Sequence, residues 1–327
     1  MNTKYIVGQS RLVNMMDRTL TSGRVAHAYL FTGPAGSGKR TLSSLFAQAL
    51  LCEGTGDKPC YTCRSCKQYE SDNHPDVEHM VKEEDKTIIS VDQVRDLRDK
   101  IKVKPYQSDR RIVFIHEAHI MTDQAQNALL KTLEEPPGQT NIILLADSEN
   151  RLLSTIISRC QIFKVGSLSA ADTAQVVSNR LAMPKEETLI FSQLSSGNPG
   201  RALTLAGNED FKEKRDRLIN GVGAGSISHL IELTPIFTED RGLALELMDI
   251  LIYWFRDILV LKETNNESLL VNMDKISMLE AQSKAFTSRA LKDNIELIEE
   301  SLRAINHFGN FQLTIENMLL GFMEGAI

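Results

Sequence analysis

The sequence predicts an α/β domain built on a five-stranded parallel sheet, followed by a region that is entirely helical. Short β-rich runs alternate with helical patterns through the first half of the chain, which is typical of a parallel sheet covered by helices. From Ser169 onward the strand pattern does not recur. The strands that we expect lie at 28–32, 77–81, 112–115, 142–146 and 161–165.

Two helices between these strands carry clear start and stop signals. Ser90 and Gln93 form a capping box ahead of apolar residues at helical spacing, and Thr122 caps the next helix. Pro136 and Pro137 end that second helix, because neither can continue the backbone hydrogen-bond ladder.

Within the helical region the sequence predicts a small segment at 168–209 and a larger one after it. The small segment contains a turn at 197–200 before Arg201. The larger one begins with a long helix and ends with amphipathic stretches at 287–308 and 311–324. A stripe of apolar residues at helical spacing is typical of core or subunit contact. In the long helix the expected buried residues are Leu247, Ile250, Leu251, Trp254, Ile258 and Leu261.

Composition and charge indicate a soluble, multi-domain globular protein. The 327 residues exceed one ordinary core, and 42% are hydrophobic and 24% charged. The longest apolar stretch, 243–261, is interrupted by charged residues, and the first eleven residues lack the apolar core of a signal peptide. We therefore expect a cytoplasmic protein without membrane contact.

The charge distribution argues against a protein that grips nucleic acid with its whole surface. The net charge is −6, whereas phosphate binding depends on Lys and Arg. The segment 95–111 is locally basic, and a solvated helix face and loop is the simpler interpretation of it. Lys102 and Lys104 are candidate DNA contacts within it.

A glycine-rich loop joins the first predicted strand to a helix, which is the context of a phosphate-binding loop. Its glycines let backbone N–H groups turn inward around phosphate oxygens, and Lys39 adds a charge for the terminal phosphates. A plain structural turn is the alternative. The sequence thus predicts an ATP or ADP site whose candidate residues are Gly33, Gly36, Gly38, Lys39, Arg40 and Thr41.

The residues that organise Mg²⁺ in a working NTPase are missing. Arg40 follows the lysine where a Ser or Thr hydroxyl is required, and Thr41 is turned about 100° further around the helix. The third strand leads into His116 and Glu117, where a working NTPase has Asp and Glu, and a neutral imidazole is a poor ligand for a hard cation. Glu117 keeps the ability to orient water. His116 and His119 are interpreted as hydrogen-bonded histidines, and we expect a scaffold that binds ATP but hydrolyses it poorly.

Four of the five cysteines follow a C-x₇-C-x₂-C-x₂-C spacing. The spacing predicts a structural zinc site that folds a segment too small for its own core, with an iron–sulfur cluster or reduced thiols as alternatives. Four protein ligands leave no open coordination position, so the site is not expected to be catalytic. Cys160 stands apart and is expected to be a buried small hydrophobe. The four ligands are Cys52, Cys60, Cys63 and Cys66.

Taken together, these motifs resemble the clamp-loader branch of the AAA+ ATPases over most of the chain. The matching segments are 7–9, 27–31, the zinc insertion, 73–76 and 127–137. The resemblance implies three domains: an AAA+ domain at 1–167 with a zinc module at 52–66, a helical lid domain at 168–209 and a helical collar domain at 210–327.

Ser158-Arg159-Cys160 is similar to the motif by which one clamp-loader subunit inserts an arginine into its neighbour's ATP site. Such an arginine is worth about 10³ to 10⁵ in rate. The resemblance implies that Arg159 is catalytic in trans and that Glu117 is vestigial. Without the motif, a surface salt bridge is the simpler interpretation of Arg159.

Two sensor positions of the family are also recognisable. The segment 197–201 resembles the second sensor, in which Arg201 would reach the phosphates of a nucleotide bound to its own chain. The first sensor is a polar Thr or Asn, and its counterpart at 146–148 matches poorly.

This pattern implies a subunit that keeps the fold, the zinc module and the arginine finger but has a degraded nucleotide site. The resemblance implies that it helps load the sliding clamp within the DNA polymerase III holoenzyme. The partners implied are the gamma/tau and delta subunits, the sliding clamp and primer–template DNA. One alternative is a gamma/tau-type motor in which Arg40 and His116 are tolerated. A stand-alone zinc-dependent DNA-binding protein is another, but it leaves Arg159 unexplained.

Overall fold

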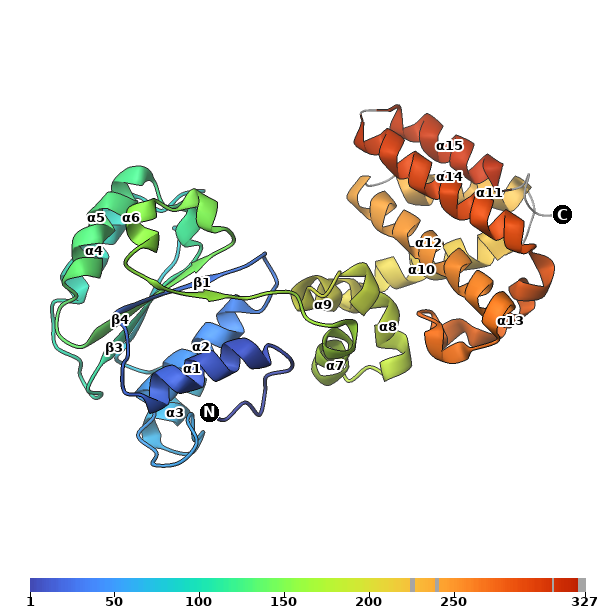
Figure 1. Cartoon of the computed structure of the whole chain (residues 1–327). Coiled ribbons are helices and arrows are strands. Elements are labelled where there is room, and N and C mark those ends of the chain that lie inside the picture. Colours follow the sequence, from blue (N-terminus) through green and yellow to red (C-terminus); the bar gives the residue numbers. More distant parts are fainter. Residues whose placement is uncertain (224–226, 239–240, 308, 323–327) are drawn as a thin grey trace. The chain divides into compact units, whose positions relative to one another are not determined.

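The computed structural model divides the chain into two compact units, Met1–Leu168 and Ser169–Ile327 (Figure 1). The first unit holds the sheet, and the second is helical wherever the structure describes a regular element. No helix among the described residues is long and apolar enough to cross a bilayer. The described residues are 1–223, 227–238, 241–307 and 309–322.

The sheet of the first unit has five parallel strands in the order β2-β3-β4-β1-β5. The predicted five-stranded parallel α/β sheet is confirmed, and each strand end falls within two residues of its prediction. Every residue of β1 and β4 is buried, because helices cover both faces of the sheet, and this explains their uninterrupted apolar runs. The strands are β1 Ala28–Thr32, β2 Val77–Met80, β3 Arg111–Ile115, β4 Thr140–Ala146 and β5 Gln161–Lys164.

Successive side chains of the strands enter two different cores. Leu30 packs with the cluster on the side of α4 and α5, whereas Tyr29 and Phe31 pack with the cluster on the side of α1 and α2 (Figure 1). The helical elements are α1 Ser10–Thr21, α2 Lys39–Leu51, α3 Arg64–Glu70, α4 Val91–Lys100, η1 Ala118–Ile120, α5 Asp123–Glu134, η2 Glu149–Arg151 and α6 Ser154–Ile157.

The predicted helix starts in this unit are confirmed. Ser90 Oγ accepts from the Gln93 backbone N–H, and Gln93 Oε1 accepts from the Ser90 N–H, which completes the capping box of α4. Thr122 caps α5 by accepting from Ala125 N–H at 3.1 Å. The helix α5 ends at Glu134, just before the two prolines.

The second unit has one continuous apolar core, with buried residues contributed from Val177 to Phe322. The predicted lid and collar segments both contribute to it, and the boundary between them at 209 and 210 stays a prediction. All six residues expected inside the long helix α12 are buried. The elements are α7 Ala170–Leu181, α8 Lys185–Leu194, α9 Pro199–Gly207, α10 Glu209–Gly223, α11 Ile227–Thr238, α12 Arg241–Thr264, η3 Glu267–Leu269, η4 Met273–Lys275, α13 Ile276–Ala285, α14 Ser288–Asn306 and α15 Phe311–Gly321.

The structure of this unit differs from the sequence prediction at one turn. The predicted turn at 197–200 is wrong in part, because Pro199 and Gly200 are the first residues of α9. Proline suits a first helical position, where its missing N–H would have no partner, and Asn198 caps the helix by accepting from Arg201 N–H at 3.0 Å. The stretches predicted at 287–308 and 311–324 correspond to α14 and α15, and residues 308, 323 and 324 lie outside the described part.

Candidate functional site

The glycine-rich loop lies between the carboxyl end of β1 and the start of α2. Gly38 has φ 93°, a left-handed conformation that favours glycine. A Cβ atom on Gly33 would lie 2.3 Å from the carbonyl oxygen of Val165, so only glycine fits this close approach. The backbone of this loop therefore requires glycine at both positions, and its role as a phosphate-binding loop stays a prediction.

The ammonium group of Lys39 is fully occupied by its own chain. It donates to the carbonyl oxygens of Gly33 at 2.6 Å and Pro34 at 2.9 Å, and to Asp147 Oδ1 at 2.7 Å. These three contacts equal the three donors of an ammonium group. The Lys39 side chain is only 10% exposed, so its charge meets the Asp147 carboxylate close to the protein interior.

Asp147 directly follows β4, at the position where the first sensor matched poorly. The parallel pairing of β1 with β4 sets Thr32 opposite Ala146, so Asp147 and the glycine-rich loop share one edge of the sheet. His119 holds Asp147 in turn: its Nδ1 accepts from Asp147 N–H at 3.2 Å, and its Nε2 lies 3.6 Å from Oδ2. Sequence reasoning missed this partner of Lys39, although a carboxylate at the end of a strand beside β1 was the available signal.

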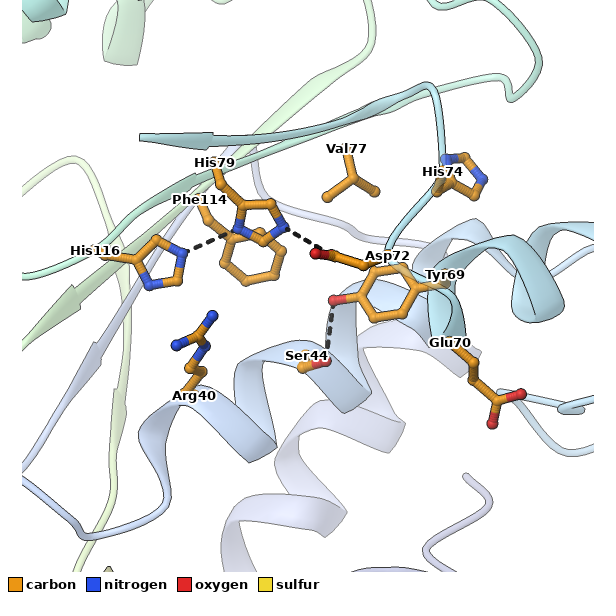
Figure 2. Close-up of a pocket in the computed structure, with 10 residues that line it drawn as sticks. All are labelled: Arg40, Ser44, Tyr69, Glu70, Asp72, His74, Val77, His79, Phe114 and His116. Carbon is orange, nitrogen blue, oxygen red and sulfur yellow. Dashed lines mark hydrogen bonds and ion pairs between the residues drawn. The ribbon is translucent and has the colours of Figure 1, made fainter. Parts of the chain in front are cut away.

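Arg40 and His116, which the sequence predicts at the positions that organise Mg²⁺ in a working NTPase, both line one cavity of about 210 Å³ (Figure 2). In Figure 2 Arg40 points from α2 toward His116. His116 Nε2 lies 3.0 Å from Nδ1 of His79, which stacks on Phe114. Burial lowers the pKa of His116 to about 4, and His79 and Arg40 add to the shift, so the ring is neutral at pH 7. The position thus presents a neutral imidazole beside a guanidinium.

The remaining nucleotide candidates have less defined surroundings. Glu117 is exposed and adopts a left-handed conformation (φ 47°) just before η1. Thr41 is exposed on α2. Arg201 belongs to the second unit, where its Nη2 lies 3.3 Å from Glu246 Oε1.

Arg159 lies between α6 and β5, at the surface of the first unit. Its Nε and Nη2 both donate to Glu134 Oε1, at 2.9 and 2.5 Å. Its Nη1 donates to the carbonyl oxygen of Thr155 at 3.0 Å. The surface salt bridge that the simpler interpretation predicted is therefore present, and the side chain stays 34% exposed.

The four predicted cysteine ligands come together. Their sulfur atoms all lie within 4.8 Å of one another, and a zinc tetrahedron with Zn–S distances of about 2.3 Å has sulfurs roughly 3.8 Å apart. Backbone N–H groups of Cys60, Cys63 and Cys66 point at cluster sulfurs at 3.3 to 3.4 Å, as suits thiolate ligands. Hydrogen bonds lower the pKa of Cys60 to about 5, and the Thr62 side chain makes the largest contribution. The donor set fits a structural zinc ion.

The fifth cysteine differs from its prediction. Cys160 is only partly buried, at the border of the core beside α4 and α5. Burial still raises the pKa of its thiol to about 12, so it is protonated at neutral pH. Cys160 is less buried than predicted because it lies at the end of a short turn before β5, where one side of the residue faces outward.

A buried polar network connects the cysteine cluster to the loop before β3. Ser65, between two cluster cysteines, has its Oγ 3.0 Å from His74 Nε2. His74 Nδ1 accepts from Asp76 N–H at 3.2 Å. The fully buried Asp76 carboxylate accepts from three successive backbone N–H groups, and these hydrogen bonds lower its pKa against the opposing effect of burial. Those N–H groups belong to Tyr106, Gln107 and Ser108.

The basic segment 95–111 is largely engaged within its own unit. Arg95 and Lys102 pair with Asp92 and Asp99 on or beside α4. Arg111 donates to the carbonyl oxygens of Lys100 and Lys104. These contacts accord with a solvated helix face and loop, and the assignment of Lys102 and Lys104 to DNA stays a prediction.

Comparison with known proteins identifies the family. Residues 8–169 match the family model described as DNA polymerase III, delta subunit, and residues 209–324 match its C-terminal model. DNA polymerase III subunit delta′ of Bacillus subtilis is 29% identical over 324 residues, 97% of each chain. The delta′ subunit of Pseudomonas aeruginosa is 35% identical over 71% of this chain and 70% of its own. Subunit tau of B. subtilis is 28% identical over 90% of this chain and 57% of its own. The chain belongs to the family of DNA polymerase III delta′ subunits.

Proposed function

We propose that this chain assists ATP-driven loading of the sliding clamp onto primed DNA, and that it donates Arg159 to the ATP site of a neighbouring motor subunit. Membership of the delta′ family supports the proposal that the chain is part of a clamp-loader complex. The other subunits of that complex would be gamma/tau and delta. Primer–template DNA would be bound by the complex as a whole, in keeping with the net charge of −6.

The observation that carries the non-motor role is the ion pair between Lys39 and Asp147. ATP phosphates need the Lys39 ammonium, which here already has three acceptors. A bound nucleotide must therefore displace one of these three acceptors, and its negative charge would lie close to the Asp147 carboxylate. Arg40 and His116 give no oxygen ligand for Mg²⁺ beside the loop. We infer that the chain has no self-sufficient ATPase.

The cysteine cluster would hold one Zn²⁺ through Cys52, Cys60, Cys63 and Cys66. The metal would fold the segment around α3, which is too short to form a core. Four sulfur ligands leave no position for substrate, so the role is structural.

Replacing Asp147 with asparagine is expected to strengthen nucleotide binding by roughly two- to five-fold, the worth of one partly exposed ion pair. The substitution removes the charge that competes with phosphate for Lys39. Equilibrium binding of a fluorescent ATP analogue to the purified chain measures the effect. Glu149→Gln is a matched control. It removes the same charge two residues further on, but Glu149 pairs with Lys164 and not with Lys39. Equal affinities of Asp147→Asn and wild type for the analogue would show that Asp147 does not compete with phosphate for Lys39.

The experiment that tests the proposed function is steady-state ATP hydrolysis by the chain alone and after mixing with a gamma/tau motor subunit. We expect no turnover by the chain alone and a higher rate in the mixture than from the motor subunit alone. Turnover by the isolated chain that Lys39→Ala abolishes would instead identify a motor subunit. In that case Arg40 and His116 would be tolerated substitutions.

A further inference from the structure

Glu134 holds the guanidinium of Arg159 by one edge. A single oxygen, Oε1, accepts from Nε at 2.9 Å and from Nη2 at 2.5 Å. Glu134 is the last residue of α5, a helix fixed by its Thr122 cap and by buried Leu129 and Leu133. The carboxylate therefore extends from the end of a packed helix and contacts two nitrogens of the arginine side chain.

The contacts leave part of the guanidinium available. An arginine has five N–H donors, two of them on Nη2. Nη1 donates to Thr155 O and lies 3.4 Å from Ser158 Oγ, while Nη2 has Glu134 as its one acceptor among the described residues. One Nη2 hydrogen is thus left for an acceptor from outside the chain. Glu134 is 49% exposed, so water screens the pair and the positive charge is only partly compensated.

Preordering matters for an arginine that acts across a subunit boundary. A free arginine side chain loses rotamer entropy when it is fixed. A misplacement of about 1 Å at a reacting centre costs on the order of 10² in rate. Contacts that fix the guanidinium before assembly reduce both losses.

We propose that Glu134 is the positioning residue of Arg159, an inference that rests on the proposed donation of Arg159 to a neighbouring ATP site. Glu134 does not touch the nucleotide. It keeps the Nε and Nη2 edge in place so that the outer part of the guanidinium meets the transferred phosphoryl group.

The test compares Glu134→Gln with wild type in the assembled complex with its motor subunit. Glutamine preserves the size of the side chain but removes the charge that binds two N–H groups. We expect Glu134→Gln to reduce, by about three- to ten-fold, the increase in kcat that this chain gives to ATP hydrolysis by the motor subunit. The KM for ATP and the affinity of assembly should stay unchanged. Glu135→Gln makes the same change of charge one residue further on and is expected to match wild type.

A double variant separates positioning from a general effect on the surface. In an Arg159→Ala background, Glu134→Gln should cause no further loss, because the group that it positions is gone. An unchanged or higher kcat in Glu134→Gln, beside a clear loss in Arg159→Ala, would overturn the positioning role alone. If Arg159→Ala itself has no effect, the proposed donation fails and the role of Glu134 fails with it. A loss of assembly affinity or of thermal stability at constant kcat would make Glu134 a structural residue.

Discussion

Arg159→Ala is expected to lower ATP hydrolysis at the partner site that this residue serves by about 10³-fold. An arginine supplied in trans stabilises the charge that develops on the transferred phosphoryl group. Single-turnover hydrolysis in the assembled complex is the direct measurement, since steady-state rates also contain turnover at other sites. The chain alone should show no change, because Arg159 is not expected to serve its own loop.

Two further variants sharpen this result. Arg159→Lys keeps a positive charge but loses the planar donor fork, so we expect it to recover only a small part of the rate. Arg151→Ala removes an exposed arginine from the same unit and should behave as wild type. A complex in which Arg159→Ala hydrolyses ATP at the wild-type rate would show that the Glu134 contact is an ordinary surface ion pair.

Loss of the metal is the second large expected effect. Cys66→Ser should reduce the metal content from about one zinc ion per chain to nearly none, and should expose the segment 53–69 to proteases. Cys66 is a fully buried member of the cluster, and the segment has no apolar core to keep it folded without the ion. In isolated zinc-finger peptides such an ion contributes on the order of 10 kcal/mol to folding. Elemental analysis and limited proteolysis measure the two outcomes.

The buried network predicts where this disturbance spreads. Ser65 links the cluster to His74 and Asp76, so backbone N–H groups at 106–108 should exchange hydrogen faster in Cys66→Ser. Cys160→Ser lies outside the cluster and should retain its metal and its protection. Visible absorbance together with iron in the purified chain would support the iron–sulfur alternative, and a full zinc content in Cys66→Ser would exclude Cys66 as a ligand.

The sequence by itself determined the features that depend on neighbours along the chain. The apolar runs of β1 and β4 gave these strands to within two residues, because each is buried on both faces of the sheet. Capping at Ser90 and Thr122 was predictable because the side chain and the N–H that it accepts from are three residues apart. The cysteine spacing likewise brought four sulfurs together through short loops.

Only the tertiary structure decided which charges meet. Lys39 and Asp147 are 108 positions apart, and they pair because β4 lies beside β1 with parallel register. Arg159 and Glu134 meet because the end of α5 lies near the turn that precedes β5. Charged side chains have many possible partners on a surface, and sequence spacing does not rank them. Sheet order and helix placement select the partner, and with it they select whether the lysine of the phosphate loop is free to bind phosphate.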